Sequence, residues 1–363
     1  MKLVTVGTVA FDDIETPRGK AGKVIGGAAT YISRSASFFV ENQGIVSVIG
    51  GDFPQEELDE MTSLGIDISG IEVRKDEKSF FWAGRYHDNM NQRDTLITDL
   101  NVLADFQPKL PQPFRTADYL MLGNLTPDVQ MDVLNQMTRR PKLVVLDTMN
   151  FWMDVAWDSL QKVLKMVDVI TINDEEARQL SGEYSLAAAA AKIYKMGPKY
   201  LIIKKGEHGV MLFREGRMFS FPALPVSEVV DPTGAGDTFA GGFTGYLART
   251  EDLSFDNMKR AIVYASDGFF LCGRFLVGQA QKHQSSGYRD ESGYLQGYDS
   301  LCDVIWYKFY STPYISADSW TVKMLDCNMQ AFFALYIQRI RKLKVLMSKP
   351  LADLQPLYDY GNT

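Results

Sequence analysis

The stretch Asp231–Phe243, DPTGAGDTFAGGF, couples a glycine turn to the start of a helix and puts a carboxylate in the first turn of that helix. Residues 218–226, just before it, alternate apolar and small side chains in a pattern typical of a strand. Apolar residues then recur at every fourth position, at Phe239, Phe243 and Leu247, which predicts the buried face of a helix. The glycines are therefore expected at a strand-to-helix junction.

A turn of this kind is suited to binding an anion. Gly234, Ala235 and Gly236 carry little or no side chain, so their backbone N–H groups can close around an anion at the positive end of the helix dipole. Asp237 would then lie beside that anion. The alternative is that Asp237 only caps the helix, because acidic residues are favoured in a first turn.

Residues 231–239, DPTGAGDTF, resemble the second signature of the PfkB (ribokinase-like) carbohydrate kinases almost letter for letter. The resemblance implies that Asp237 is the general base for a substrate hydroxyl and that the turn Gly234–Gly236 holds the transferring phosphoryl group. It also implies ATP and Mg²⁺ as cofactors, with Asp231 and Thr233 beginning a site for a monovalent cation. Phosphoryl transfer depends mainly on positioning and charge stabilisation, so a carboxylate of ordinary pKa is an adequate base.

The composition limits the classes of partner. A net charge of −7 argues against nucleic-acid and membrane-surface partners, which usually require a basic face. The opening MKLVTVG has no targeting pattern, and no apolar run reaches the roughly 20 residues that span a bilayer, so we expect a cytoplasmic protein. The cysteines, Cys272, Cys302 and Cys327, form no CxxC pair, and only three histidines are present, which argues against a zinc site.

Near the start of the chain, residues 2–7 form a short apolar run that predicts the buried first strand of a parallel sheet. Asp12 follows soon after, where ligands of open α/β sheets bind, and a solvated turn is the alternative. The resemblance places a sugar-binding carboxylate at Asp12. Gly26 and Gly27 resemble the first family signature, in which such a pair contacts the sugar, but Tyr31 stands where the family usually has Asn.

Aromatic residues and then a polar run fill residues 79–103, which we interpret as strands of a small β lid over the sugar, together with residues 10–25. A plain surface hairpin is the alternative interpretation. The resemblance further implies a homodimer that pairs through the lid.

Repeated apolar runs, each ending in a polar residue, predict βα units at residues 119–124, 143–147 and 169–173. Together they predict an α/β fold, a doubly wound and mostly parallel sheet with the β lid attached. Asn124, a predicted substrate residue, would then share the ligand edge with Asp147 and Asn150.

The stretch Asn173–Glu176 resembles the family's Asn-x-x-Glu motif. That motif implies a role for Asn173 near the nucleotide and for Glu176 in holding Mg²⁺ through water, whereas the local sequence alone favours an acidic helix start. Residues 200–212 predict a hairpin, and the resemblance lays its turn, with Lys205, Gly206 and Gly209, along the ATP.

The sequence therefore predicts an ATP-dependent kinase of a hydroxyl on a small sugar. It contains neither a P-loop motif nor a dinucleotide fingerprint after the first strand. A nucleoside kinase is the first alternative, because Tyr31 and Trp82 could stack on a base. An inactive sugar-binding or scaffold protein with a damaged ATP site is the second.

The resemblance covers residues 1–266, which we interpret as the kinase domain, and stops at Asp267. Residues 267–363 contain all three cysteines and lose the βα rhythm. We interpret this atypical tail as a shifted reading frame, because one permitted set of codons for residues 267–281, read one base later, encodes a sequence similar to that of PfkB kinases. A genuine C-terminal extension is the alternative.

Overall fold

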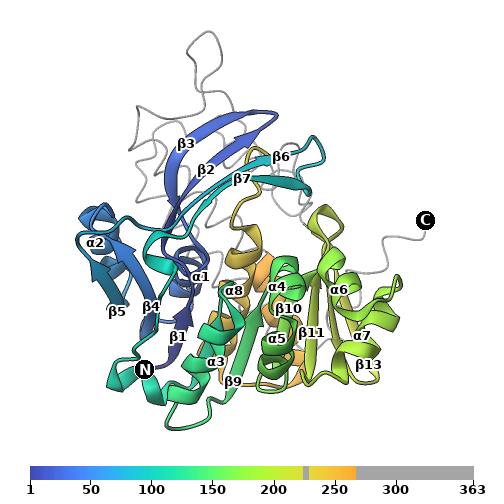
Figure 1. Ribbon diagram of the computed structural model, residues 1–363. Coiled ribbons are helices and arrows are strands. Elements are labelled where there is room, and N and C mark those ends of the chain that lie inside the picture. The colour runs from blue at the N-terminus through green and yellow to red at the C-terminus, as the bar shows by residue number, and fades with distance from the viewer. Residues whose placement is uncertain (224–228, 267–363) are drawn as a thin grey trace, which may run out of the picture. The chain divides into compact units, whose positions relative to one another are not determined.

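A nine-stranded sheet organises the described part of the chain (Figure 1). The computed structural model describes residues 1–223 and 229–266. The strand order is β13-β12-β11-β10-β9-β8-β1-β4-β5, and neighbours are parallel except at β11-β12 and β12-β13. The strands are β1 Leu3–Val6, β4 Gln43–Gly50, β5 Ile66–Arg74, β8 Tyr119–Leu122, β9 Leu143–Asp147, β10 Val169–Asn173, β11 Tyr200–Lys204, β12 Val210–Arg214 and β13 Arg217–Phe221.

Helices cover both faces of this sheet, because its strands are apolar on both sides. Along β1, Val4 and Val6 enter one core, whereas Leu3 enters the other. Helices α3, α5, α6 and α7 contribute to the first core, and α1, α8 and the helical residues 255–266 contribute to the second. The helices are α1 Ala28–Ser37, α2 Gln55–Ser63, α3 Pro127–Gln136, α4 Asn150–Val155, α5 Trp157–Leu164, α6 Asp174–Ser181, α7 Leu186–Tyr194 and α8 Ala235–Thr250.

The strand order reverses at β1, which defines where a ligand would bind. From β1 the chain goes to β4 and β5 on one side, and it later returns to β8, β9, β10 and β11 on the other. A crevice forms beyond the carboxyl ends of the strands at such a switch point. Asp147, Asn173 and Lys204 end β9, β10 and β11, so these three polar residues share that edge.

A second, four-stranded sheet has the order β3-β2-β6-β7 (Figure 1). Its presence agrees with the prediction of strands within residues 10–25 and 79–103. The alternative of a lone surface hairpin is wrong, because β2 and β6 pair in parallel and join two hairpins into one sheet. The strands are β2 Ala10–Thr16, β3 Gly19–Gly26, β6 Phe81–Tyr86 and β7 Arg93–Asp99.

Helices α1 and α8 pack side by side in the same direction. A Cβ added to Gly241 would lie 2.2 Å from the carbonyl oxygen of Ile32, and one added to Gly245 would lie 2.9 Å from Cα of Ala36. Only glycine at these positions allows such close contact of the two backbones. The contact brings the N-termini of both helices to the same edge of the sheet.

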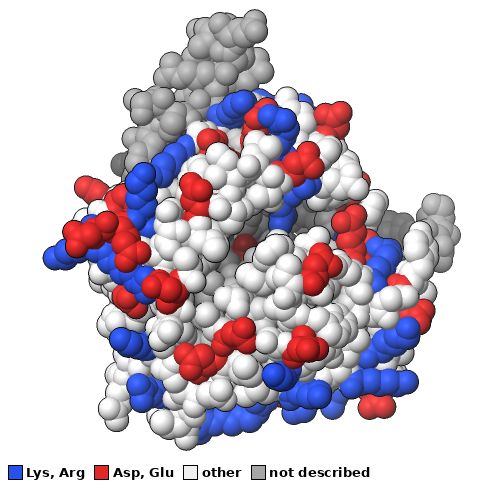
Figure 2. Space-filling view, viewed as in Figure 1, with Lys and Arg blue, Asp and Glu red and all other residues white. Residues whose placement is uncertain are grey.

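The predicted α/β fold is therefore confirmed, as is the helix after the glycine turn, with Phe239, Phe243 and Leu247 buried. The predictions for residues 267–363 lie outside the described residues. In the described part of the chain, no helix combines the length and apolar character that crossing a membrane requires. Basic and acidic side chains are interspersed over the face of the protein shown in Figure 2.

Candidate active site

The turn before α8 has the geometry predicted for an anion site. Gly234 precedes the first helical residue with φ 74° and ψ 0°, in the left-handed region that favours glycine. The N–H of Thr233 donates to Oδ1 of Asp231 at 2.8 Å, which fixes the chain just before the turn. Among the described residues, the N–H groups of Gly236 and Asp237 meet no acceptor, so the start of α8 offers free donors to an anion.

Both glycines of this turn are in close contact with side chains from other elements. A Cβ on Gly234 would lie 2.7 Å from the ring of Tyr31, and one on Gly236 would lie 2.9 Å from Nζ of Lys204. Tyr31 is only 4% exposed. Its ring therefore packs against the turn, and this burial contradicts the expectation that Tyr31 stacks on a base.

Asp12 lies on strand β2, and its carboxyl is buried, so the alternative of a solvated turn is wrong. A Cβ on Gly26 would lie 2.0 Å from Oδ2 of Asp12, and the backbone N–H of Gly27 donates to the same carboxyl. Gly27, with φ 95°, then begins α1. The glycine pair thus leaves room for the Asp12 carboxyl at the start of α1, within electrostatic range of Asp237.

A cluster of charged side chains occupies the carboxyl edge of the sheet. Nζ of Lys204 lies 3.0 Å from Oδ1 of Asp147, and both side chains are largely buried. The carboxylates of Glu176 and Asp237 also act on this ammonium. Sequence reasoning missed Lys204 and named its neighbour Lys205, although the alternation of side chains along β11 was a signal that could have distinguished them.

Glu176 both caps helix α6 and takes part in the charged cluster. It closes a capping box at the start of α6, since the Asn173 N–H donates to Oε2 of Glu176 and the Glu176 N–H donates to Oδ1 of Asn173, each at 2.8 Å. The acidic helix start is therefore present. The same carboxyl also faces Lys204 and Asp147, so its capping role does not remove it from the charged cluster.

The remaining predicted residues lie on loops at the same edge. The Lys205 N–H donates to the carbonyl of Gly209 at 2.8 Å and closes the β11-β12 turn. A Cβ on Gly206 would lie 2.7 Å from Oδ1 of Asn91, so the β6-β7 turn of the second sheet reaches this loop. Asn124 follows β8, and its side chain accepts a hydrogen bond from Nε1 of Trp152 at 2.8 Å.

The second sheet contributes two further residues that sequence reasoning missed. The hydroxyl groups of Tyr86 and Thr233 are 3.2 Å apart, which ties β6 to the residues just before the glycine turn. Burial raises the pKa of Asp12, Glu176 and Asp237, and the guanidinium of Arg93 partly offsets that rise. Arg93 pairs with Tyr86 across the two strands, so both present their side chains to the same face.

Three carboxyls in this region have strongly raised pKa values. Burial is the main cause for each, and it raises the pKa of Asp12, Glu176 and Asp237 to about 7. Neighbouring carboxylates add to the effect: Asp231 acts on Asp12, and Asp147 acts on both Glu176 and Asp237. A cluster of perturbed carboxyls around free N–H donors is typical of a catalytic site.

These pKa shifts predict a stability that falls as the pH rises. A carboxyl whose pKa is raised on folding stabilises the folded state below its unfolded pKa, and this contribution is lost as the pH passes through about 7. We expect urea denaturation of the ligand-free protein to give a lower free energy of unfolding at pH 8 than at pH 6, by on the order of 1 kcal/mol for each carboxyl. The double variant Asp12→Asn/Asp237→Asn should show a smaller difference in unfolding free energy between pH 6 and pH 8. An unchanged difference would contradict the raised pKa values of these two carboxyls.

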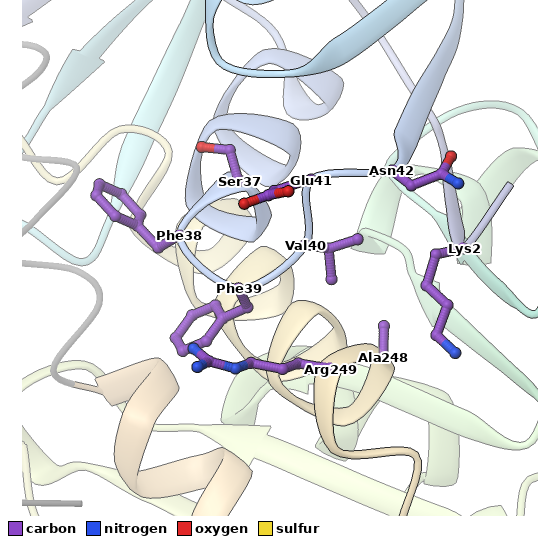
Figure 3. Close-up of a pocket in the computed structure, with 9 residues that line it drawn as sticks. All are labelled: Lys2, Ser37, Phe38, Phe39, Val40, Glu41, Asn42, Ala248 and Arg249. Atoms are coloured by element: carbon purple, nitrogen blue, oxygen red, sulfur yellow. The ribbon is translucent and has the colours of Figure 1, made fainter. Parts of the chain in front are cut away.

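A surface pocket of about 520 Å³ lies elsewhere (Figure 3). It is lined by Ser37 at the end of α1, by residues 38–42 that follow it, by Ala248 and Arg249 of α8, and by Lys2. The pocket therefore lies at the C-terminal ends of the two helices whose N-termini carry Gly27 and Gly234. None of its lining residues belongs to the charged cluster, so it is not the candidate active site.

Comparison with known proteins agrees with this geometry. Residues 2–261 match the pfkB family carbohydrate kinases. A cytidine kinase from Thermococcus kodakarensis is 30% identical over 259 residues, which cover 70% of this chain and 91% of that protein. The fold resembles the nucleoside kinase of Methanocaldococcus jannaschii (TM-score 0.60, 17% identity, 78% and 99% coverage) and the ribokinase of Arabidopsis thaliana solved with ribose and ATP (0.58, 20%, 73% and 91%). The chain thus belongs to the pfkB family of carbohydrate kinases and has the ribokinase-like fold.

Proposed function

We propose that this kinase transfers the γ-phosphoryl group of ATP to a hydroxyl on the sugar ring of a small acceptor, with Asp237 as the general base. The observation that carries the proposal is the position of Asp237 in the first turn of α8, beside N–H groups that meet no acceptor in the described residues. A base with a pKa of about 7 is suited to accept a proton near neutral pH.

The residues divide the reaction between them. Asp237 accepts the proton of the acceptor hydroxyl as that oxygen bonds to the γ-phosphorus and the bond to the β–γ bridging oxygen breaks, which leaves ADP. At the turn Gly234–Gly236, the free N–H groups of Gly236 and Asp237 stabilise the charge on the phosphoryl oxygens. Asp12 holds acceptor hydroxyls opposite Asp237 and orients the attacking oxygen.

The chain has residues that fit ATP and its ions. Asn173, Lys205, Gly206 and Gly209 would lie along the nucleotide, on turns that follow β10 and β11. Glu176 would hold Mg²⁺ through water, since Mg²⁺ keeps several waters and takes few protein oxygens. Bound Mg²⁺ neutralises phosphate charge. Asp231 and Thr233 would begin a monovalent-cation site beside the turn.

A nucleoside is the favoured acceptor. The supporting observation is the cytidine kinase relative, which this chain matches over 91% of that protein's length. Trp82 lies directly opposite Asp12 in the pairing of β2 with β6, so an aromatic ring and the proposed sugar-binding carboxyl share one face of the second sheet. A base stacked on Trp82 would leave its ribose near Asp12. Free sugars such as ribose remain the second candidate.

Steady-state turnover with MgATP and a panel of cytidine, adenosine, ribose and fructose tests this function. We expect kcat/KM for the best nucleoside to exceed that for either free sugar by at least about tenfold, a difference of about 1.4 kcal/mol in transition-state binding. Preference for ribose or fructose would overturn the nucleoside assignment. Absence of turnover with every acceptor would overturn the kinase proposal and favour an inactive binding protein.

Replacing Asp12 by alanine should weaken binding of the acceptor far more than binding of ATP. Loss of a charge-assisted hydrogen bond costs roughly 1.5–3 kcal/mol, which corresponds to at least about tenfold in Kd. Calorimetry with the best acceptor measures this. The neighbouring variant Asp13→Ala is the control, because successive side chains of β2 point to opposite faces. An acceptor Kd that Asp12→Ala leaves unchanged would exclude Asp12 from the site.

We also propose that two copies pair through the second sheet. Strand β7 is an edge strand whose residues are all exposed, including Leu96 and Ile97 at 47% each. An exposed edge with apolar side chains is a template for strand pairing. Sedimentation of the full chain should give the mass of a dimer, and a monomer at all concentrations would contradict the proposal.

A further inference from the structure

Lys204 is a charged residue of the site that the proposed reaction has not used. It is the last residue of β11, and its ammonium lies 3.0 Å from Oδ1 of Asp147, with side-chain exposures of 19% and 10% for the two residues. Burial lowers the pKa of Lys204, but Asp147, Glu176 and Asp237 together raise it above its usual range. Lys204 is therefore positively charged, and its ion pair with Asp147 fixes the position of the ammonium group.

The ammonium also touches the glycine turn. Nζ of Lys204 lies 2.9 Å from the position that a Cβ on Gly236 would occupy, and Cε and Cδ follow at 3.6 and 3.8 Å. The last three atoms of the side chain thus lie close to Gly236. A positive charge here lies beside the N–H groups that have no acceptor in the described residues.

A phosphoryl group at this turn requires such a cation. Three carboxylates act on Lys204, and they would repel the negative phosphoryl group. Two like charges 4 Å apart repel by about 4 kcal/mol at an effective dielectric constant of about 20, and a cation between them offsets this repulsion. Arg93, another basic residue that acts on these carboxyls, belongs to the second sheet and is exposed. Within residues 1–223 and 229–266, Lys204 is the cation that the main sheet itself places at the turn.

We propose that Lys204 is a catalytic residue that binds the phosphoryl group during transfer, exchanging the Asp147 carboxylate for the phosphoryl oxygens. This inference rests on the proposed kinase function. The ammonium keeps its protons throughout: the acceptor oxygen gains the phosphorus, the β–γ bridging oxygen loses it, and the acceptor proton goes to Asp237. Asp147 holds the ammonium in place before the nucleotide binds and so preorganises it.

The competing interpretation is that Lys204 and Asp147 form only a structural ion pair between β11 and β9. Lys199 provides a matched control, because Nζ of Lys199 lies 3.1 Å from Oδ1 of Asp168 just before the same strand begins. A structural pair would affect stability, and its loss would weaken ATP and ADP alike. A phosphoryl-binding ammonium would distinguish nucleotides that carry a γ-phosphate from those that lack one.

The test compares Lys204→Met, Lys204→Arg and Lys199→Met in the full chain. We expect Lys204→Met to lower kcat/KM by about 10²–10³-fold, the usual loss for one donor to the transferring group, and Lys204→Arg to recover part of it. In calorimetry, Lys204→Met should raise the Kd of the β,γ-imido analogue of ATP by at least about tenfold. The Kd of ADP should stay within about threefold of its value for the unaltered enzyme. Lys199→Met should change neither value.

Two results would overturn the assignment. One is a Lys204→Met enzyme whose kcat/KM stays within about threefold of the unaltered enzyme; the other is equal weakening of the ATP analogue and ADP. Thermal denaturation shows whether the Lys204→Met variant is folded in each case. If it does not fold, Lys204→Arg, which keeps the charge, is compared with the unaltered enzyme instead. If the unaltered protein transfers no phosphoryl group, the proposed function is contradicted. If the unaltered enzyme is active and Lys204→Met does not reduce its activity, only the role of Lys204 is contradicted.

Discussion

Replacing Asp237 by asparagine is expected to lower kcat by about 10²–10⁴-fold, because the carboxamide keeps the shape of the side chain but cannot accept the hydroxyl proton. Binding of MgATP and of the acceptor should be nearly unchanged. The variant should also be more stable than the unaltered protein at pH 8, since ionising a carboxyl whose pKa is raised to about 7 opposes folding there. Steady-state kinetics and urea denaturation of one preparation measure both effects.

Asp256→Asn is the matched control for this substitution. Asp256 is an exposed aspartate with 69% side-chain exposure, paired with Lys259 away from the charged cluster. It should retain full activity and show no gain in stability at pH 8. If Asp237→Asn kept kcat within about tenfold of the unaltered enzyme, Asp237 would not be the base.

Replacing Gly241 by alanine is expected to destabilise the protein by about 2 kcal/mol. The added methyl group would lie 2.2 Å from the carbonyl oxygen of Ile32, which is backbone of α1 and cannot rotate away. Overpacking of this kind costs about 1–3 kcal/mol or more, and the better helix propensity of alanine recovers at most about 1 kcal/mol. Activity should fall as well, because separating α1 from α8 moves Gly27 away from Gly234.

The adjacent Gly242→Ala is the control, because it makes the same chemical change in the same helix. Its methyl group would lie 3.1 Å from Cα of Ala265 and 3.3 Å from Oγ of Ser35, distances that small shifts can relieve. The cost of Gly242→Ala should be clearly smaller than that of Gly241→Ala in chemical denaturation. Equal stabilities of the two variants would show that the α1–α8 contact does not limit the fold.

Features that depend on local pattern could be predicted from the sequence. Every fourth residue of α8 from Phe239 to Leu247 is apolar and buried, and the apolar runs that become β8, β9 and β10 are each followed by or end in a polar residue. These periodicities were sufficient to predict the helix and the strands. The glycine turn was equally accessible, because a φ of 74° at Gly234 requires the residue type that the sequence shows.

Features that depend on contacts between distant segments could not be predicted. Tyr31 was expected to face a ligand, but its ring lies against Gly234, which is about 200 residues away along the chain. The alternation of side chains along β11 separates Lys204 from Lys205, but it does not show which of the two faces the cluster, because that depends on the pairing of β11 with β10. The burial of Asp12 likewise depends on the pairing of β2 with both β3 and β6.

The most direct test of the central claim is a product assay that counts ADP and phosphorylated acceptor together, with MgATP and cytidine. The account predicts one ADP for each phosphorylated cytidine, no ADP without an acceptor, and loss of both products in Asp237→Asn. Formation of ADP that does not depend on an acceptor, or a folded protein that forms neither product with any nucleoside or sugar, would contradict it.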